Sequence, residues 1–203
     1  HECEIAQNVG ACGNEPVRYW MHTNMLNFNG QKMSKSLGNS ILPMQFITGD
    51  HPLLDKPYSA MTVRFLFMQS HYSSELDITI KGLQDAEKGL RKLLNAAKYL
   101  KELKQENINI DTDIDSSVKK QCELCKDCMD DDFNSAKLIS VLYELASHIN
   151  VFYNDGKNAH MISEETYHLL QSAYNAYLFD VLGLQDDTAA GNGNNDALDK
   201  VMQ

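Results

Sequence analysis

The segment ITIKGLQDAEKGLRKLLNAAKYLKELKQ, residues 78–105, carries the clearest structural pattern in this chain of 203 residues. With about 100° of rotation per residue, its leucines and alanines gather on one side of a helix and most of its basic residues lie on the other. The predicted apolar stripe consists of Leu83, Ala86, Leu90, Leu93, Leu94 and Ala97. The segment is therefore predicted to form one long amphipathic helix.

Further helices are predicted on both sides of this one. The helical period recurs over residues 59–70, 117–129, 135–153 and 163–182, with an acidic loop expected over 108–115. Ser163 suits a helix start, because its hydroxyl can accept a backbone N–H bond, and Gly183 suits a helix end. Residues 51–184 are thus predicted to form a helical bundle, and the polar residues 185–203 a flexible linker and the start of a further helix.

Residues 1–50 have a mixed character. A run rich in aromatic residues and methionine, 17–28, precedes Asn29-Gly30, and this pair favours a tight hairpin because both residues tolerate positive φ. An exposed loop is expected over 31–39 and a short helix over 43–47, which starts with a proline. The predicted fold is mainly α, with a short β-hairpin and loop segment followed by the bundle.

Composition excludes several classes of protein. The chain holds 18 Lys and Arg against 28 Asp and Glu, a net charge of −10, so bulk charge does not favour nucleic-acid binding, although a local patch could. No apolar run approaches the roughly 18–20 residues of a membrane span, and no cationic signal segment opens the chain. Five cysteines do not indicate a disulfide framework. We therefore expect a cytoplasmic protein without membrane association. We also expect a monomer.

The string KMSKSLGN, residues 32–39, is the first candidate for chemistry. Lys32 and Lys35 supply two compact charges, each with three hydrogen-bond donors, and these suit phosphate oxygens that change position during a reaction. Small Ser and Gly residues allow backbone N–H groups to approach phosphates. The alternative is an ordinary solvated loop, although the whole string after a hairpin is more specific than two lysines alone.

The string resembles the KMSKS signature of class I aminoacyl-tRNA synthetases. The flanking segments HECEIAQ (1–7), RYWMH (18–22) and His71-Tyr72 narrow the resemblance to the cysteinyl-tRNA synthetase family. MDDDFN, residues 129–134, is similar to a motif in the helical bundle of that family. The resemblance is strong over residues 1–80 and weaker beyond.

The resemblance implies an enzyme that activates cysteine with ATP and transfers it to the 3′ end of its tRNA. Residues 1–50 would be the end of the catalytic domain and 51–184 the anticodon-binding bundle. The nucleotide-binding portion with its HIGH motif and a small C-terminal domain would lie outside the chain, so we expect a fragment that is inactive alone. Lys32 and Lys35 would be the catalytic residues, and Lys35 would bind ATP within the motif Lys32, Met33, Ser34, Lys35 and Ser36.

The first residues contain three types of zinc ligand, at His1, Cys3 and Glu4. In the family that the chain resembles, zinc binds the thiolate of the substrate cysteine. Glu4 matches one ligand of that zinc, whereas His1 matches the residue next to a ligand and the other ligands would lie upstream. The alternative is that these residues have no role in metal binding.

Cys122, Cys125 and Cys128 are spaced like ligands of a metal or an iron–sulfur cluster. This spacing would fit a metal or redox protein. The same positions fall within a predicted helix, where cysteine behaves as a small apolar residue. We therefore favour a role in the core.

The basic side of segment 78–105 is the last candidate. Residues 81–104 hold seven Lys or Arg against three acidic residues, a local charge of +4. The exposed strip is predicted to contain Lys81, Lys88, Arg91, Lys92 and Lys98. This strip could face tRNA or simply be solvated, and the former would also fit a non-catalytic helical RNA-binding module.

Overall fold

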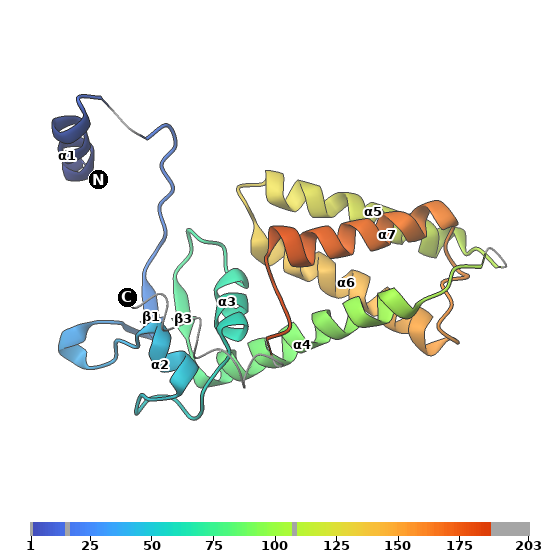
Figure 1. Ribbon diagram of the computed structural model, residues 1–203, viewed down its shortest axis with the longest axis horizontal. Helices are drawn as coiled ribbons and strands as arrows, with labels where there is room; N and C mark the ends of the chain where they lie inside the picture. Colours follow the sequence, from blue (N-terminus) through green and yellow to red (C-terminus); the bar gives the residue numbers. More distant parts are fainter. Residues whose placement is uncertain (1, 15–16, 107–108, 188–203) are drawn as a thin grey trace.

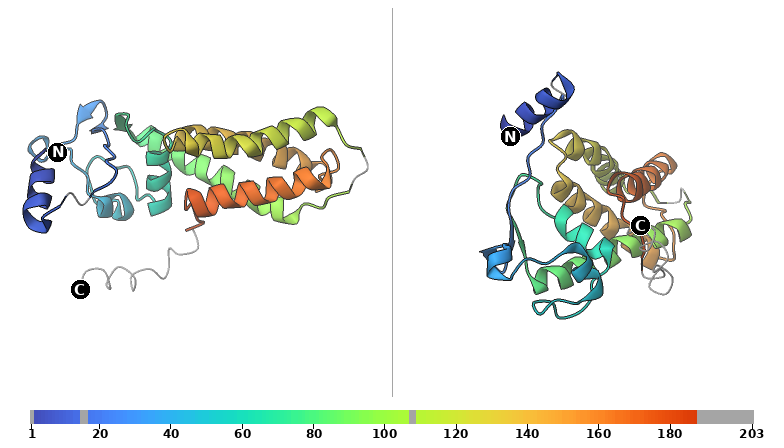
Figure 2. Two further views of the ribbon diagram at one scale, coloured as in Figure 1. Left: turned by 90° about the horizontal axis from the view of Figure 1, so that it is seen from above. Right: turned by 60° about the vertical axis from the view of Figure 1, so that its left-hand side comes forward.

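The computed structural model describes residues 2–14, 17–106 and 109–187. Its long helices pack side by side at one end of an elongated molecule, and a small sheet with shorter helices forms the other end (Figures 1 and 2). No helix among the described residues is long and apolar enough to cross a membrane.

The bundle consists of α4 (Ile80–Glu102), α5 (Thr112–Asp130), α6 (Ser135–Asn154) and α7 (Glu164–Asn175). α6 packs against both α4 and α5, and α7 packs against α5 (Figure 1). All six residues of the predicted apolar stripe on α4 are buried. The prediction of a mainly α fold with a helical bundle is confirmed.

Side chains at the helix starts fix where the helices begin. The hydroxyl of Ser163 accepts an N–H bond from Thr166 at the start of α7, as predicted. The expected acidic loop over 108–115 is wrong from Thr112 onward, since α5 already begins there. The Asp111 carboxylate accepts the N–H groups of Asp113 and Ile114 at 3.0 and 3.1 Å, and acidic residues in the first turn stabilise the helix dipole.

The bundle ends in a wider turn than an α-helix. Residues Ala176–Val181 (η2) form a π-helical turn after α7, in which Leu182 N–H donates to the Tyr177 carbonyl at 3.0 Å. Gly183 follows with φ +62°, as expected for a residue that terminates a helix.

A three-stranded sheet organises the other end of the molecule. β1 (Leu26–Phe28) pairs antiparallel with β2 (Gln31–Lys32) and parallel with β3 (Leu76–Ile78). The predicted hairpin is confirmed, with Asn29 and Gly30 at φ +52° and +73°. Ile78 was expected in the long helix but belongs to β3, because α4 starts only after its N-terminal cap Thr79.

Short helices join the sheet to the bundle. α2 (Pro43–Thr48) confirms the predicted short helix, and α3 (Ala60–Met68) buries Phe65 and Leu66 against the remaining core. α1 (Glu2–Cys12), which is described over its whole length, has no buried residue and stands apart from the rest of the chain (Figure 1).

The first residues of the predicted linker contact α3 and α4. Asp187 Oδ2 accepts the N–H of Met61 at 3.1 Å, and Asp186 Oδ2 lies 2.6 Å from Lys98 Nζ. The rest of the linker and the expected start of a further helix lie outside the described residues.

Candidate functional site

The lysine loop, residues 32–39, forms a defined turn between β2 and α2. A 3₁₀ turn, η1 (Lys35–Leu37), begins at Ser34, whose hydroxyl accepts the N–H of Leu37 at 3.3 Å. Gly38 ends the turn with φ +66°, a conformation that glycine adopts without steric cost. The loop is exposed over most of its length, as expected, but its backbone is ordered by hydrogen bonds.

The two lysines lie at different points of this loop. Lys32 is the last residue of β2, and Lys35 is the first residue of η1. Both side chains are exposed. Lys35 also lines a surface pocket of about 270 Å³ together with Gly38, Ser40, Leu42 and Gln45. Its ammonium group can therefore reach a ligand held at the junction of the loop and α2.

Asn39 is a feature of this loop that the sequence did not reveal. The sequence marked it only as the end of the loop, yet the residue is 7% exposed. Its Oδ1 accepts the N–H of Ser34 at 2.9 Å, and its Nδ2 donates to the Lys32 carbonyl at 3.1 Å. A single side chain thus joins the two ends of the turn.

Glu4, the predicted zinc ligand, lies on the exposed helix α1, and Cys3 beside it is also exposed. His1 lies outside the described residues. Among the described residues, no group of three or more His, Cys, Asp or Glu side chains could hold a metal ion. Structural and catalytic zinc sites need three or four protein ligands, so the described residues do not form a zinc site by themselves.

The three cysteines of α5 lie in the core. Cys122 is 4% exposed, and Cys125 and Cys128 are fully buried. Burial raises the pKa of the Cys122 and Cys125 thiols to about 12 and also raises that of Cys128. Reactive and metal-binding cysteines have the opposite tendency, a lowered pKa. Their burial confirms the expected packing role.

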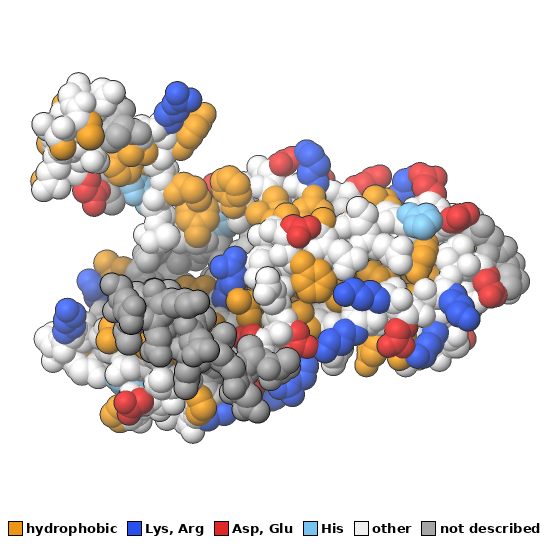
Figure 3. All heavy atoms as spheres, in the orientation of Figure 1, with side chains coloured by type: hydrophobic (Ala, Val, Ile, Leu, Met, Phe, Trp, Pro, Cys, Tyr) orange, Lys and Arg blue, Asp and Glu red, His pale blue; other side chains and the backbone are white. Residues whose placement is uncertain are grey.

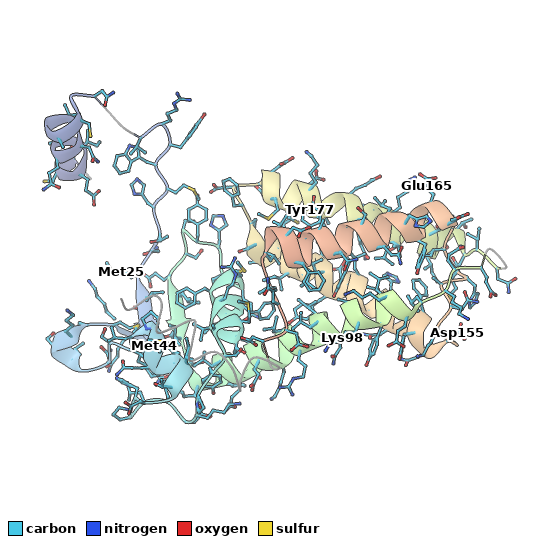
Figure 4. All side chains as sticks on the ribbon, viewed as in Figure 1. Met25, Met44, Lys98, Asp155, Glu165 and Tyr177 are labelled. Carbon is cyan, nitrogen blue, oxygen red and sulfur yellow. The ribbon has the colours of Figure 1, made fainter. Side chains whose placement is uncertain are left out.

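The predicted basic strip on α4 is exposed along its whole length. It comprises Lys81, Lys88, Arg91, Lys92 and Lys98. Figure 3 shows basic side chains along the lower edge of the molecule, where α4 runs, with acidic side chains between them. Lys98, labelled in Figure 4, is paired with Asp186, which partly neutralises that end of the strip.

The middle of the strip borders a groove. Lys88, Arg91 and Lys92 line an open groove of about 370 Å³ with the polar side chains of Asn95, Tyr99 and Asn150. Lys92 Nζ also lies 5.6 Å from the centroid of the Tyr143 ring, within reach of a cation–π interaction. Cations beside amide and aromatic groups are the side chains that proteins use to contact RNA backbones and bases.

Two family models match separate parts of the chain. Residues 1–88 match the class I (C) catalytic domain of tRNA synthetases, and residues 126–185 match the DALR domain. A cysteine–tRNA ligase from Parabacteroides distasonis is 44% identical over the full chain. The chain is a homologue of the cysteine–tRNA ligases. This finding agrees with the resemblance that the sequence motifs indicated.

Other relatives extend the comparison. The cysteine–tRNA ligase of Cytophaga hutchinsonii is 43% identical over 93% of this chain, and that of Deinococcus radiodurans is 36% identical over 94%. The chain spans 40% of the length of the Parabacteroides protein and 38% of that of the Cytophaga protein.

A solved structure shows a similar fold. It is the ternary complex of Agrobacterium radiobacter K84 agnB2 LeuRS with tRNA and LeuAMS, with a TM-score of 0.50 and 18% sequence identity. The similarity covers 90% of this chain and 25% of the LeuRS chain. At this level of identity the likeness concerns the fold alone.

Proposed function

We propose that this chain is the part of a cysteine–tRNA ligase that carries the KMSKS loop and a tRNA-binding helical bundle. The whole enzyme would activate cysteine with ATP and transfer it to the 3′ end of its tRNA. The observation that carries this proposal is the ordered lysine loop, in a chain 44% identical over its full length to a cysteine–tRNA ligase. Residues 1–50 would complete the catalytic domain, 51–184 would form the bundle, and 185–203 would form a linker and the start of a further helix.

Lys32 and Lys35 would act on the phosphates of ATP. When cysteine attacks the α-phosphate, negative charge builds up on the phosphate oxygens and on the departing pyrophosphate. Two exposed ammonium groups can stabilise that charge without forming a covalent bond. Lys35 has the stronger case, because it lines the pocket beside η1, while Met33, Ser34 and Ser36 shape the loop around it.

Zinc would serve to bind the thiolate of the substrate cysteine, and we propose Glu4 as one of its ligands. The described residues do not complete that site, so none of the steps above depends on the metal. We also propose that the enzyme is a cytoplasmic monomer.

The bundle would contact tRNA through the strip on α4. The chain has a net charge of −10, so attraction to a polyanion must come from a region where the sign of the charge is reversed. Lys88, Arg91 and Lys92 offer such a region beside a groove with polar walls. Lys98 is less well placed, because its ammonium group lies 2.6 Å from Asp186, whereas Lys88 Nζ lies 3.8 Å from the exposed carboxylate of Asp85.

The test is cysteine-dependent exchange of pyrophosphate into ATP by the full-length protein that contains this chain. We expect exchange with cysteine and none above background with serine. The isolated chain of 203 residues should give no exchange. If the full-length protein binds tRNA but supports no exchange, the chain belongs to a non-catalytic RNA-binding protein and the proposal is wrong.

A further inference from the structure

Asn39 stands out in the lysine loop because it is the only buried polar residue of that turn, which the structure describes in full. Its neighbours Lys35, Ser36, Leu37 and Gly38 are all exposed, whereas Asn39 is buried, with 7% of its surface exposed. Burying an amide is costly unless its hydrogen bonds are formed. The position of Asn39 therefore has to be explained by what its amide holds.

Both ends of the amide are used, and each has a different partner. The oxygen accepts from Ser34 N–H at 2.9 Å, and the nitrogen donates to the Lys32 carbonyl at 3.1 Å. An amide can accept and donate at the same time, whereas a carboxylate only accepts and a hydroxyl is too short to span both groups. The two bonds fix the backbone on either side of Met33.

The sheet holds the same stretch from its other side. Met33 N–H donates to the Leu26 carbonyl of β1 at 3.1 Å, and the Met33 side chain packs against the core. The backbone from Lys32 to Ser34 is thereby tied to β1 and to Asn39. Lys35 is the next residue, so the backbone from which its side chain extends is held in place.

We propose that Asn39 is a positioning residue for Lys35. Its amide closes the turn so that the Lys35 ammonium group is directed toward the phosphates. The inference rests on the proposed function, since it assigns Lys35 to ATP. An exposed lysine has many rotamers, and a fixed backbone limits the volume that its ammonium group explores. Displacement of a reacting group by about 1 Å can reduce a rate by roughly 100-fold.

The test compares two variants of Asn39 in the full-length protein. Asn39→Ala removes both hydrogen bonds, whereas Asn39→Asp keeps the acceptor for Ser34 N–H and places a negative charge against the Lys32 carbonyl. We expect both variants to lower kcat for cysteine-dependent exchange by roughly 10- to 100-fold. The KM for cysteine should not change, because the loop faces phosphate and not the amino acid.

Asn24 provides a matched control. Its amide also accepts one backbone N–H bond, from Met25 at 2.8 Å, and donates one bond to the carbonyl of Ser73 at 3.1 Å. Asn24 is exposed, and its two bonds join its own backbone segment to Ser73, outside the lysine loop. Asn24→Ala and Asn24→Asp should leave kcat within about twofold of the wild-type value, the scale of a surface change.

Hydrogen exchange at the Ser34 amide in the 203-residue chain gives a second readout that needs no activity. Asn39→Ala should speed this exchange, and Asn39→Asp should retain most of the protection while still lowering kcat. Unchanged exchange at Ser34 in Asn39→Ala would show that the Asn39 side chain does not hold the Ser34 amide.

The activity data separate this inference from the proposed function. A wild-type protein without exchange activity overturns the proposed function. The role of Asn39 in positioning Lys35 is then overturned as well. An active wild type with unchanged kcat in both Asn39 variants overturns the positioning role alone. Equal losses of kcat in the Asn39 and Asn24 variants would also overturn it, because the effect would then reflect general loosening of the fold.

Discussion

Different interactions stabilise the lysine loop and the helical bundle. Among residues 31–42, all of which the structure describes, only Asn39 and Ile41 are buried, and the turn is shaped by hydrogen bonds. In the bundle, α4 and α6 each bury eight residues. Apolar burial contributes about 25 cal/mol per Å², whereas an exposed loop contributes little. If the proposed function is right, the chemistry lies in the loop and most of the stability comes from the bundle, so substitutions in the two regions should have different effects.

The largest expected effect is on the chemical step. Lys35→Ala in the full-length protein should lower the rate of cysteinyl-adenylate formation by roughly 10²–10³-fold, the size of effect expected when one charge-stabilising donor is removed. The free energy of unfolding should stay within about 0.5 kcal/mol of wild type, because the side chain is exposed. Single-turnover kinetics and urea unfolding check the two statements.

A matched lysine controls for the loss of charge. Lys126 on α5 is also exposed and pairs with Asp130 one turn further along the helix. Lys126→Ala should leave adenylate formation unchanged. A comparable loss of rate in both variants would mean that net charge, and not the position of Lys35, is responsible.

The bundle should show the opposite behaviour. Leu142 on α6 is fully buried, so Leu142→Ala removes apolar contacts and leaves a cavity, which costs about 2–5 kcal/mol of unfolding free energy. The exposed Ser140→Ala on the same helix should cost less than about 0.5 kcal/mol. Urea unfolding measures both, and similar values for the two variants would contradict the packing described for α6.

The cysteines of α5 add a pH dependence to this stability. Burial raises the pKa of the Cys122 and Cys125 thiols to about 12, well above the ordinary value. At a pH below the ordinary thiol pKa, the thiols are protonated in both the folded and the unfolded chain, and their contribution to the free energy of unfolding is complete. At a pH above the ordinary thiol pKa, the thiols of the unfolded chain lose protons that those of the folded chain keep. The free energy of unfolding therefore falls as the pH rises toward the pKa of the folded state. The loss at pH 10 should be roughly 1–2 kcal/mol per thiol.

The variant with Cys122, Cys125 and Cys128 all replaced by alanine isolates this effect. At pH 7 it should be less stable than wild type, because buried thiols contribute packing, and its activity should be nearly intact. The difference in unfolding free energy should narrow between about pH 8 and pH 10. A difference that stays constant with pH would show that the pKa values of the thiols are the same in the folded and the unfolded chain.

The smallest effect is expected for the strip on α4. Replacing Lys88, Arg91 and Lys92 by alanine should weaken tRNA binding by the full-length protein and reduce the salt slope by about one unit for each phosphate that is no longer neutralised. The matched control removes the same charge from α5 and α6, through alanine at Lys119, Lys126 and Lys137. If the salt slope of tRNA binding is the same in the two triple variants, the strip is not part of the RNA interface.

The sequence revealed those features that depend on local pattern. The stripe on α4 was predictable because leucines recur with the helical period, and the hairpin was predictable because Asn29-Gly30 favours its tight turn. The lysine loop was recognised from its string of residues. The start of α5 was missed because the acidic residues after Ile110 were assigned to a loop, although Asp111 caps the helix.

Features that depend on distant partners were not predictable. β3 has three residues, and its parallel partner β1 lies some fifty residues earlier in the chain. Asp186 and Asp187 belong to a segment with the composition of a linker, yet they bond to Lys98 and Met61, 88 and 126 positions away. The burial of Asn39 likewise arises from tertiary packing around the loop, which the string KMSKSLGN does not specify.

The most direct test of the division between the two regions combines Lys35→Ala with Leu142→Ala in the full-length protein. Adenylate formation, measured where all variants are folded, should be as slow in the double variant as in Lys35→Ala. The unfolding free energy should be as low as in Leu142→Ala, because well-separated sites act independently. A slow chemical step in folded Leu142→Ala, or a loss of several kcal/mol in Lys35→Ala, would contradict the division.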